Sequence, residues 1–163
     1  MAIRKIVTLG DEALRKACRR EEKFGLRLQL LLKDMAETMY KAEGVGLAAP
    51  QVGILRRVVV IDAGDGLVEL VNPEIIERDG EQCGREGCLS LPGRQAIVTR
   101  PRRVRFRAQD RKGAWYEREA EGLFARAVCH ELDHLDGRLY IDVMDRELTP
   151  EEIEGHVPED DNE

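Results

Sequence analysis

The chain has 163 residues, with 26 lysines and arginines against 32 aspartates and glutamates and a formal net charge of −6 at pH 7. This length fits one ordinary domain, and the excess of acid gives no positive field to attract nucleic acid or an anionic membrane. Hydrophobic residues make up 42% of the chain, which excludes wholesale disorder, and the longest apolar run, Val58 to Ile61, is far shorter than the ~20 residues of a transmembrane helix.

The first residues, Met1 to Ile6, lead directly into polar sequence without the apolar stretch of a secretion signal. We therefore expect a cytoplasmic protein without stable binding to nucleic acid or membranes. Its four cysteines are then expected to be reduced thiols or metal ligands rather than a disulfide framework.

The N-terminal part of the chain predicts two helices, a loop and a strand. Residues Asp11 to Arg19 read as a short helix, and Leu26 to Tyr40 carry apolar side chains at spacings of three and four. Glycines and a proline make residues 44–53 an irregular stretch, and the β-branched run 58–61 then predicts a strand.

Short strands are expected around residues 67–71, 96–98 and 104–110, and a hairpin turn at Arg111-Lys112-Gly113 leads into 115–118. A locally basic stretch accompanies these strands, and we interpret it as a solvated strand face rather than an RNA-binding surface, because aromatic residues for base stacking are few. It comprises Arg94, Arg100, Arg102, Arg103, Arg105 and Arg107.

A second long helix is predicted from Leu123 through Leu135, ending at Gly137. From Glu147 onward the chain is acidic and poor in apolar residues. We therefore expect one catalytic domain over residues 1–146 and an acidic, flexible tail over residues 147–163, in which His156 is solvated.

The sharpest chemical signal is His130-Glu131-Leu132-Asp133-His134, within that second helix. Histidines four residues apart lie on one helix face, where both imidazoles can reach one metal ion. Glu131 directly follows the first histidine, which turns its carboxylate toward the open coordination position and suits it to act as a general base.

A catalytic metal site needs a third protein ligand, and the residues leave several candidates. The extended pattern H-x-x-G-x-x-H fails because Tyr140 stands at its last position. A zinc protease would use a later glutamate, Glu151, Glu152 or Glu154, whereas Cys88 would supply a thiolate. A non-enzymatic alternative combines Cys83 and Cys88 with both histidines in a closed structural zinc site.

Three segments together resemble the signature motifs of bacterial, type I peptide deformylases, and they occur in the order of that family. They are Gly44-Val45-Gly46-Leu47-Ala48-Ala49-Pro50-Gln51, Glu86-Gly87-Cys88-Leu89-Ser90 and His130-Glu131-Leu132-Asp133-His134. The similarity spans nearly residues 4 to 146.

The resemblance implies that Cys88, His130 and His134 bind the metal and that Glu131 is the general base and acid. Gln51 and the backbone N–H of Leu89 would form the oxyanion hole. The remaining implied residues line the cleft and an apolar pocket for methionine; they are Val45, Gly46, Gly87, Leu123, Arg126 and Ala127.

This chain also departs from the family. Many relatives carry glutamine where Cys129 stands, and some carry arginine where this chain has Gln95 beside Arg94. We expect Cys129 to point away from the ligand face and to pack as a small hydrophobe, and Cys18 and Cys83 to be plain thiols.

The expected fold is α+β, with short, mostly antiparallel sheets around a central helix that bears the two histidines and is covered by the helix 26–40. The resemblance implies a hydrolase that removes formyl from the N-terminal formylmethionine of new polypeptides and releases formate. It further implies ferrous iron and transient association with the ribosome, although zinc, nickel or cobalt would suit the same ligands.

Overall fold

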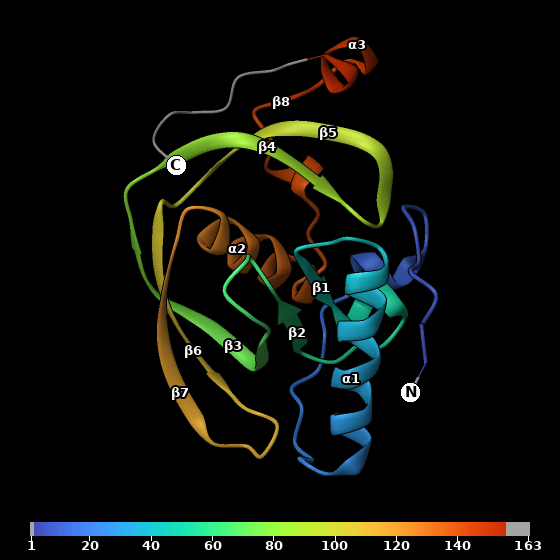
Figure 1. Ribbon diagram of the computed structural model, residues 1–163, viewed down its shortest axis with the longest axis vertical. Coiled ribbons are helices and arrows are strands. Elements are labelled where there is room, and N and C mark those ends of the chain that lie inside the picture. The colour runs from blue at the N-terminus through green and yellow to red at the C-terminus, as the bar shows by residue number, and fades with distance from the viewer. Residues whose placement is uncertain (1, 156–163) are drawn as a thin grey trace.

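The computed structural model, which describes residues 2–155, has two antiparallel sheets and a central helix, α2, between them (Figure 1). The expected α+β class is thus confirmed. One sheet has the order β1-β2-β3-β6-β7, and the other has the order β4-β5-β8. Their bounds are Gly46–Ala48 (β1), Val58–Ile61 (β2), Val68–Asp79 (β3), Gln82–Cys88 (β4), Leu91–Arg100 (β5), Arg103–Gln109 (β6), Trp115–Glu121 (β7) and Arg146–Glu147 (β8).

Two long helices and several short ones complete the described part of the chain. Helix α1 spans Leu26–Lys41, α2 spans Leu123–Leu135, and the short α3 spans Pro150–Glu154. Single 3-10 turns occupy Glu12–Arg15, Ala49–Val52 and Tyr140–Asp142. Both long helices lie where apolar periodicity predicts them. Among residues 2–155, none of the helices has the length and apolarity needed to cross a membrane.

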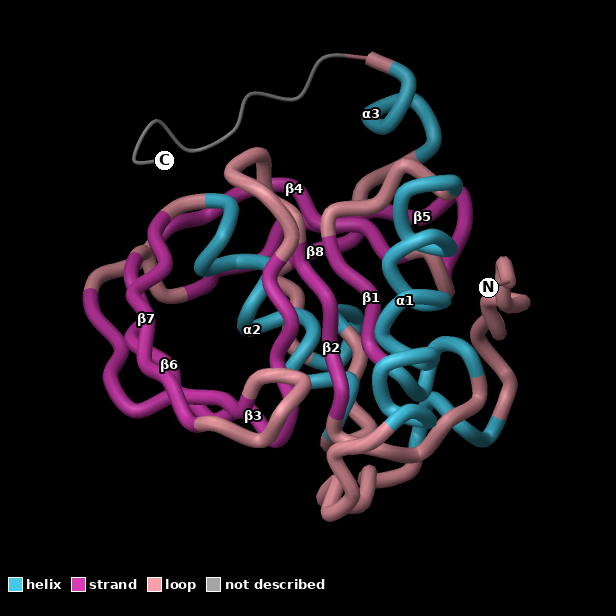
Figure 2. Tube along the Cα trace, turned by 60° about the horizontal axis from the view of Figure 1, so that its bottom comes forward, coloured by secondary structure: helices cyan, strands magenta, loops and turns pink. Residues whose placement is uncertain are grey.

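Strand β2 lies between the two long helices, and its four residues are all fully buried. Because side chains alternate along a strand, Val59 and Ile61 pack in the core with α2, while Val58 and Val60 pack in the core with α1. The helix α1, which we expected to cover the central helix, lies on the other side of the sheet, so that β1 and β2 stand between the two helices (Figure 2).

The predicted helix over residues 11–19 is mostly absent. Asp11 caps only the 3-10 turn Glu12–Arg15, and the following residues are extended. The backbone N–H of Cys18 donates to the Leu135 carbonyl at 2.8 Å, and that of Arg19 donates to the Leu55 carbonyl at 3.0 Å. These tertiary hydrogen bonds, one to the C-terminal end of α2 and one to the loop before β2, replace the local helical ones.

The structure also differs from the expected flexible tail over residues 147–155. Glu147 pairs with Ala96 in the small sheet, Leu148 is buried, and Thr149 caps α3. The C-terminal segment, residues 146–154, therefore packs against β5. His156 and the other residues of 156–163 lie outside the described part of the chain.

The outer face of β6 matches the interpretation of the basic stretch as a solvated surface. Arg103 and Arg105 pair across the sheet with Glu119 and Glu117, and Arg107 pairs with Glu74. These side chains are all partly exposed, so the arginines are neutralised within the sheet and offer no continuous cationic surface.

Glycine at position 137 is required by the turn that ends α2. Its φ is +75°, and a Cβ there would lie 2.7 Å from the Arg15 carbonyl oxygen. We predict that Gly137→Ala lowers the free energy of unfolding by about 1–3 kcal/mol, as measured by urea denaturation. Gly25→Ala, where a Cβ meets nothing within 4 Å, is the control and should change it by less than about 0.5 kcal/mol. Equal effects of the two substitutions would contradict this assignment.

Candidate metal and catalytic site

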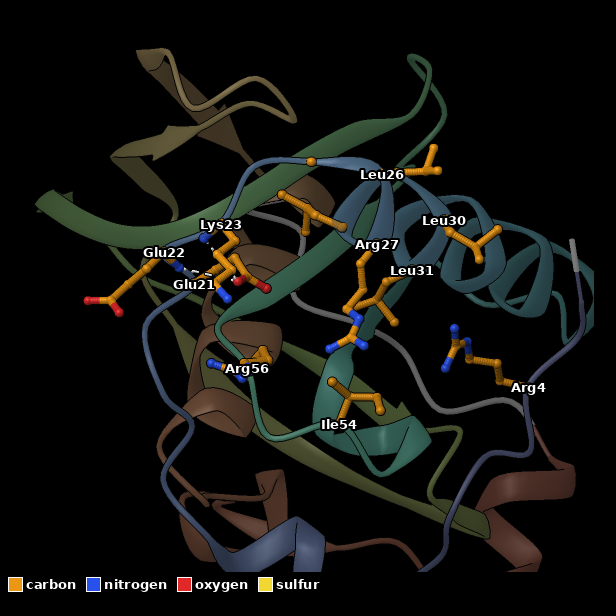
Figure 3. A pocket seen from close by; sticks show the side chains of 12 residues that line it. Arg4, Glu21, Glu22, Lys23, Leu26, Arg27, Leu30, Leu31, Ile54 and Arg56 are labelled. Atoms are coloured by element: carbon orange, nitrogen blue, oxygen red, sulfur yellow. Dashed lines mark hydrogen bonds between the residues drawn. The ribbon is translucent and has the colours of Figure 1, made fainter.

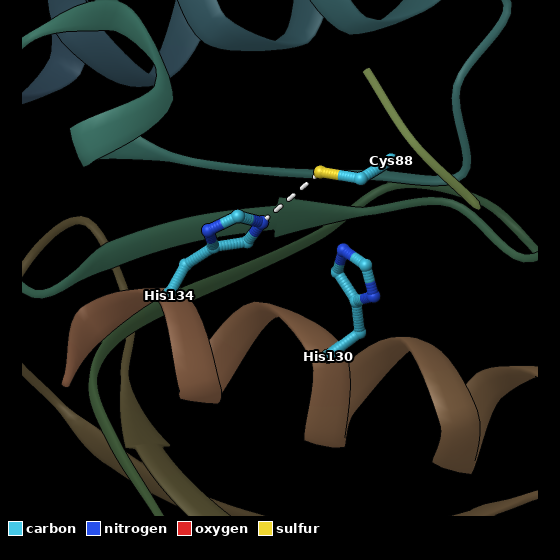
Figure 4. Close-up of side chains that lie close together, drawn as sticks. All are labelled: Cys88, His130 and His134. Carbon is cyan, nitrogen blue, oxygen red and sulfur yellow. Dashed lines mark hydrogen bonds between the residues drawn. The ribbon is translucent and has the colours of Figure 1, made fainter. Parts of the chain in front are cut away.

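The structure brings one thiol and two imidazoles together. His130 and His134 lie one turn apart on α2 and point toward Cys88, the last residue of β4 (Figure 4). The three potential ligand atoms lie within 4.8 Å of one another, and the Cys88 Sγ is 3.3 Å from the His134 Nε2. Soft thiolate and imidazole donors in this arrangement suit a divalent transition metal.

Cys88 reaches the histidines because the β4–β5 hairpin changes register beside it. Gly87 pairs with Gln95, whereas Cys88 pairs with Leu91, so the intervening residues of β5 bulge outward. A bulge bends its strand and redirects the side chains next to it. The thiol therefore comes from the end of a strand, at the point where its pairing with β5 shifts register.

A buried carboxylate, Glu86, holds the first histidine. Its Oε1 lies 2.7 Å from the Nδ1 of His130, which leaves the Nε2 of that ring for a metal. Arg100 binds Glu86 with two nitrogens at 3.0 and 2.7 Å, and Arg126 donates to it at 2.8 Å. Arg100 also donates to Asp133 at 2.8 Å, so two guanidinium groups face two carboxylates.

Our sequence interpretation missed this cluster. Arg100 was assigned to the solvated arginine face, which was wrong: it is 7% exposed and lies among acids. Glu86 received no role, although a signal was present. Every second residue of β4 faces the interior, and these residues are Gln82, Gly84 and Glu86. A carboxylate therefore occupies an inward position two residues before the metal-ligand candidate Cys88.

Burial and neighbouring charge shift the pKa values of this cluster. Desolvation opposes the charged form of Glu86, but hydrogen bonds from His130 and Arg100 outweigh it and hold its pKa well below the usual range. For His130, desolvation is outweighed by Glu131, Cys88 and Glu86, which raise its pKa. For His134, desolvation and the nearby His130 lower the pKa, which favours the neutral imidazole that a metal requires.

Glu131 lies beside the ligand group and is 4% exposed. Burial raises its pKa to about 7, against the opposing effect of His130. A Cβ on Gly46 would lie 2.6 Å from the Glu131 Oε2, so the glycine makes room for the carboxylate. The Oε1 of Glu131 is buried and has no hydrogen-bond partner among residues 2–155, which leaves an acceptor free for a substrate or water.

Gln51 presents amide N–H groups to the same place. Its Nε2 donates to the Ser90 Oγ at 3.1 Å and lies 3.5 Å from the Cys88 sulfur, while its Oε1 accepts from the Ala48 N–H at 3.0 Å. These contacts fix the orientation of the amide. Leu89, between Cys88 and Ser90, packs where a Cβ on Gly44 would clash with its side chain at 2.7 Å.

A cavity of about 350 Å³ opens beside this group. Every residue assigned to the site from sequence lines it except His134, which is 1% exposed and lies deeper. The lining includes Val45, Gly46, Gln51, Gly87, Cys88, Leu89, Leu123, Arg126, Ala127, His130 and Glu131. The Nη1 of Arg126 donates to Glu86 and to the Val98 carbonyl, so this nitrogen is not available to a molecule in the cavity.

The alternative ligands lie elsewhere. Cys83 donates to the Asp145 carboxylate at 3.9 Å and is not part of the ligand group, and Glu152 pairs with Arg146. Cys18 and Cys129 are buried, and desolvation raises the pKa of each thiol to about 11. Within residues 2–155, the ligand group thus has three members, which leaves a position open for chemistry.

A larger cavity of about 950 Å³ lies at the N-terminal end of α1 (Figure 3). Leu26, Leu30 and Ile54 form apolar parts of its wall, with Arg27 and Arg56 among the charged ones. None of the residues assigned to the site from sequence lines it, so size alone does not identify the reactive cavity in this molecule.

Comparison with known proteins identifies one family. The family model described as polypeptide deformylase matches residues 3–149. The chain is 57% identical to a peptide deformylase of Caldicellulosiruptor bescii over 94% of its length and 93% of the relative, and 58% identical to peptide deformylase 1 of Clostridium acetobutylicum over 88% and 96%. The crystal structure of a peptide deformylase from Legionella pneumophila superposes with a TM-score of 0.84 at 46% identity and covers 87% of this chain and 86% of its own. That of the peptide deformylase from Thermotoga maritima superposes with a TM-score of 0.85 at 44% identity and covers 87% of this chain and 97% of its own.

The ligand group predicts how two cysteines differ. We expect Cys88→Ser to weaken binding of Co²⁺ at least about 10-fold and to remove the thiolate-to-cobalt charge-transfer band in a spectroscopic titration. Cys83→Ser is the matched control, because it changes another partly exposed cysteine of the same strand. It should leave both affinity and spectrum unchanged; loss of binding in this variant would favour the closed structural zinc site.

The raised pKa of Glu131 predicts a pH-dependent stability of the metal-free protein. With an ordinary value of 4.5 and a folded value of about 7, wild-type stability decreases as pH rises from 4.5 through 7, because the unfolded carboxyl ionises first. Glutamine does not ionise, so the unfolding free energy of Glu131→Gln minus that of the wild type should increase by up to about 3 kcal/mol as the pH rises from 4.5 to 8. Urea denaturation across this range measures it, and a constant difference between the two proteins would contradict the shift.

Proposed function

The chain belongs to the polypeptide deformylase family, metal-dependent hydrolases that remove the N-terminal formyl group of nascent polypeptides, and we propose that Cys88, His130, His134 and Glu131 carry this reaction here. The observation that supports these roles best is the meeting of three metal-type donors and a buried carboxylate at one end of the cavity. Binding and proton transfer are then possible at the same place.

The donor set suits one divalent ion. A thiolate and two neutral imidazoles leave such an ion with a net charge near +1 and an open coordination position. When bound there, the ion would supply a Lewis acid that lowers the pKa of water toward neutrality. Glu86 would keep the His130 ring oriented, since it occupies the Nδ1 of that ring at 2.7 Å.

Glu131 is proposed to move the proton. Its carboxylate would take a proton from the attacking water and pass it to the amine nitrogen as the bond between the formyl carbon and that nitrogen breaks. The products are formate and a free amino terminus. A carboxyl group whose pKa is about 7 can both accept and release a proton near neutral pH, and the glycine at position 46 leaves it the necessary space.

The developing negative charge on the formyl oxygen requires donors. We assign them to the Gln51 side-chain amide and the backbone N–H of Leu89. Gln51 supports its assignment by its position beside Cys88 and by the hydrogen bond from Ala48 that holds its oxygen. A fixed donor of this kind contributes roughly 3 kcal/mol to transition-state stabilisation in comparable enzymes.

The methionine side chain is assigned to the cavity wall beyond the metal ligands. Val45, Gly46 and Gly87 would border the main chain of the substrate, and Leu123, Arg126 and Ala127 would border the side chain. All six line the cavity. Leu123 is 49% exposed at its mouth, where an apolar substrate group would cover it.

The remaining assignments rest on the family resemblance and the substrate. Ferrous iron is the proposed native metal, although zinc, nickel and cobalt suit these ligands as well. Because formylated chains emerge from ribosomes, we propose a cytoplasmic enzyme that associates transiently with them. The catalytic unit is assigned to residues 1–146, and the acidic segment that follows begins with residues 147–154, which pack against β5.

Formate release from formyl-Met-Ala tests the assigned roles directly. We predict that Glu131→Ala lowers kcat/KM by about 100- to 10,000-fold while the metal content stays near one per chain. Glu121→Ala, on the exposed side of β7, is the control and should retain wild-type activity. Persistent activity in Glu131→Ala would require a different proton carrier.

The contact between Gly46 and Glu131 predicts a second effect. In Gly46→Ala the new methyl group must displace the carboxylate, so kcat should fall about 10- to 100-fold with the metal retained. Gly25→Ala, where nothing lies within 4 Å of the new methyl group, should leave kcat unchanged. A normal kcat in Gly46→Ala would show that Glu131 does not depend on this glycine for its position.

A further inference from the structure

The outer rim of the cavity carries two cations, Arg85 on β4 and Arg94 on β5. Both turn toward the C-terminal segment, residues 146–154. Arg94 binds the Glu147 carboxylate with two nitrogens at 2.7 and 2.9 Å, and Arg85 donates to the Glu152 carbonyl. Glu152 in turn pairs with Arg146. The segment thus contacts both rim arginines, with a carboxylate at Arg94 and a backbone carbonyl at Arg85.

The Arg94–Glu147 ion pair is not needed to hold this segment in place. Its two side chains are 37% and 36% exposed, and exposed pairs contribute little to folding stability. Other contacts fix the main chain: Glu147 pairs with Ala96, the Leu148 N–H donates to the Gln95 carbonyl at 2.9 Å, and Leu148 is buried. The main effect of the Glu147 carboxylate is therefore to neutralise Arg94.

The rim lies close to the proposed reactive group. The Arg94 carbonyl and the Gln95 Cγ are each 3.4 Å from where a Cβ on Gly87 would stand, and Gly87 directly precedes Cys88. Because Arg94 lines the same cavity as Cys88 and His130, residues after methionine would pass near it when the formyl group lies at the proposed metal ligands. Deeper in the cavity, Arg126 pairs with Glu86. At the rim, Arg85 meets only a backbone carbonyl, so Arg94 is the rim cation whose charge a carboxylate of this chain balances.

We propose that Glu147 is a specificity-determining residue: it occupies Arg94 and so removes the preference of this arginine for acidic residues that follow formylmethionine. A free guanidinium here would bind acidic side chains and repel basic ones. An enzyme that acts on nascent chains meets every kind of second residue, and an internal carboxylate removes this bias without removing the arginine. This inference rests on the proposed function of the cavity.

The test compares amidated tripeptides, so that no terminal carboxylate contributes. The peptides are formyl-Met-Glu-Ala, formyl-Met-Gln-Ala and formyl-Met-Lys-Ala, together with formyl-Met-Ala-Glu and formyl-Met-Ala-Gln. For the metal-loaded wild type at low salt, we expect kcat/KM values for acidic and neutral peptides within about twofold. In Glu147→Gln the ratio of kcat/KM for the acidic peptide to that for the neutral peptide should rise about 3- to 10-fold, mainly through a lower KM for the acidic peptide. We expect this rise when the charged residue is either the second or the third of the peptide.

Further variants separate this effect from a structural one. The gain should disappear in Arg94→Gln/Glu147→Gln and shrink strongly in 0.5 M KCl. Arg94→Glu, which leaves two carboxylates at the rim, should prefer the lysine peptide. Glu117→Gln is the matched control, because it breaks an exposed pair with Arg105 on the outer sheet and should leave all ratios unchanged.

Unchanged ratios in Glu147→Gln at both positions, or a gain that persists in the double variant, would overturn the inference. The proposed function is tested separately, by formate release from formyl-Met-Gln-Ala in the wild type and its loss in Glu131→Ala. A wild type that releases formate while Glu147→Gln shows no charge preference would therefore reject only the role of Glu147.

Discussion

The contact between the Glu86 carboxylate and the His130 ring is the interaction on which the rest of the site depends. It satisfies one ring nitrogen and directs the other toward Cys88 and His134. The carboxylate can remain charged in the interior because Arg100 and Arg126 both bind it, and Asp133 balances the second guanidinium. Removing Glu86 or one of the two arginines would leave an unpaired buried charge, so these three residues stabilise the interior only as a group.

The sheets give this cluster its fixed frame. Glu86 and Cys88 come from β4, Arg100 from β5, and the remaining members from α2. The inner strands of the large sheet pack against the other side of α2, so the helix that carries both histidines is held between two sheets. The three proposed metal ligands and Glu131 therefore lie on packed strands and helices, which suits a reaction that needs fixed distances.

Several features of this structure could be predicted from the sequence, and the reasons are local. The spacing of His130 and His134 requires only a helix, and β-branched residues suffice to predict β2. The third ligand could not be chosen from spacing alone, because Cys88 lies 42 residues before His130 and meets it only through the β4–β5 hairpin. The helix expected at 11–19 failed for a related reason, since its backbone bonds to Leu135 and Leu55, which are remote in sequence. The buried role of Arg100 likewise depends on partners from two other elements.

The division of the metal donors between the hairpin and α2 has a consequence for the whole molecule. An ion bound by the proposed ligands Cys88, His130 and His134 would join two elements that are otherwise held together by packing and the Glu86 cluster. Loading with metal is thus thermodynamically equivalent to adding a cross-link between these two layers. The complete donor set exists only when α2 is folded against the β4–β5 hairpin, so binding of such an ion would be coupled to the docking of these two layers.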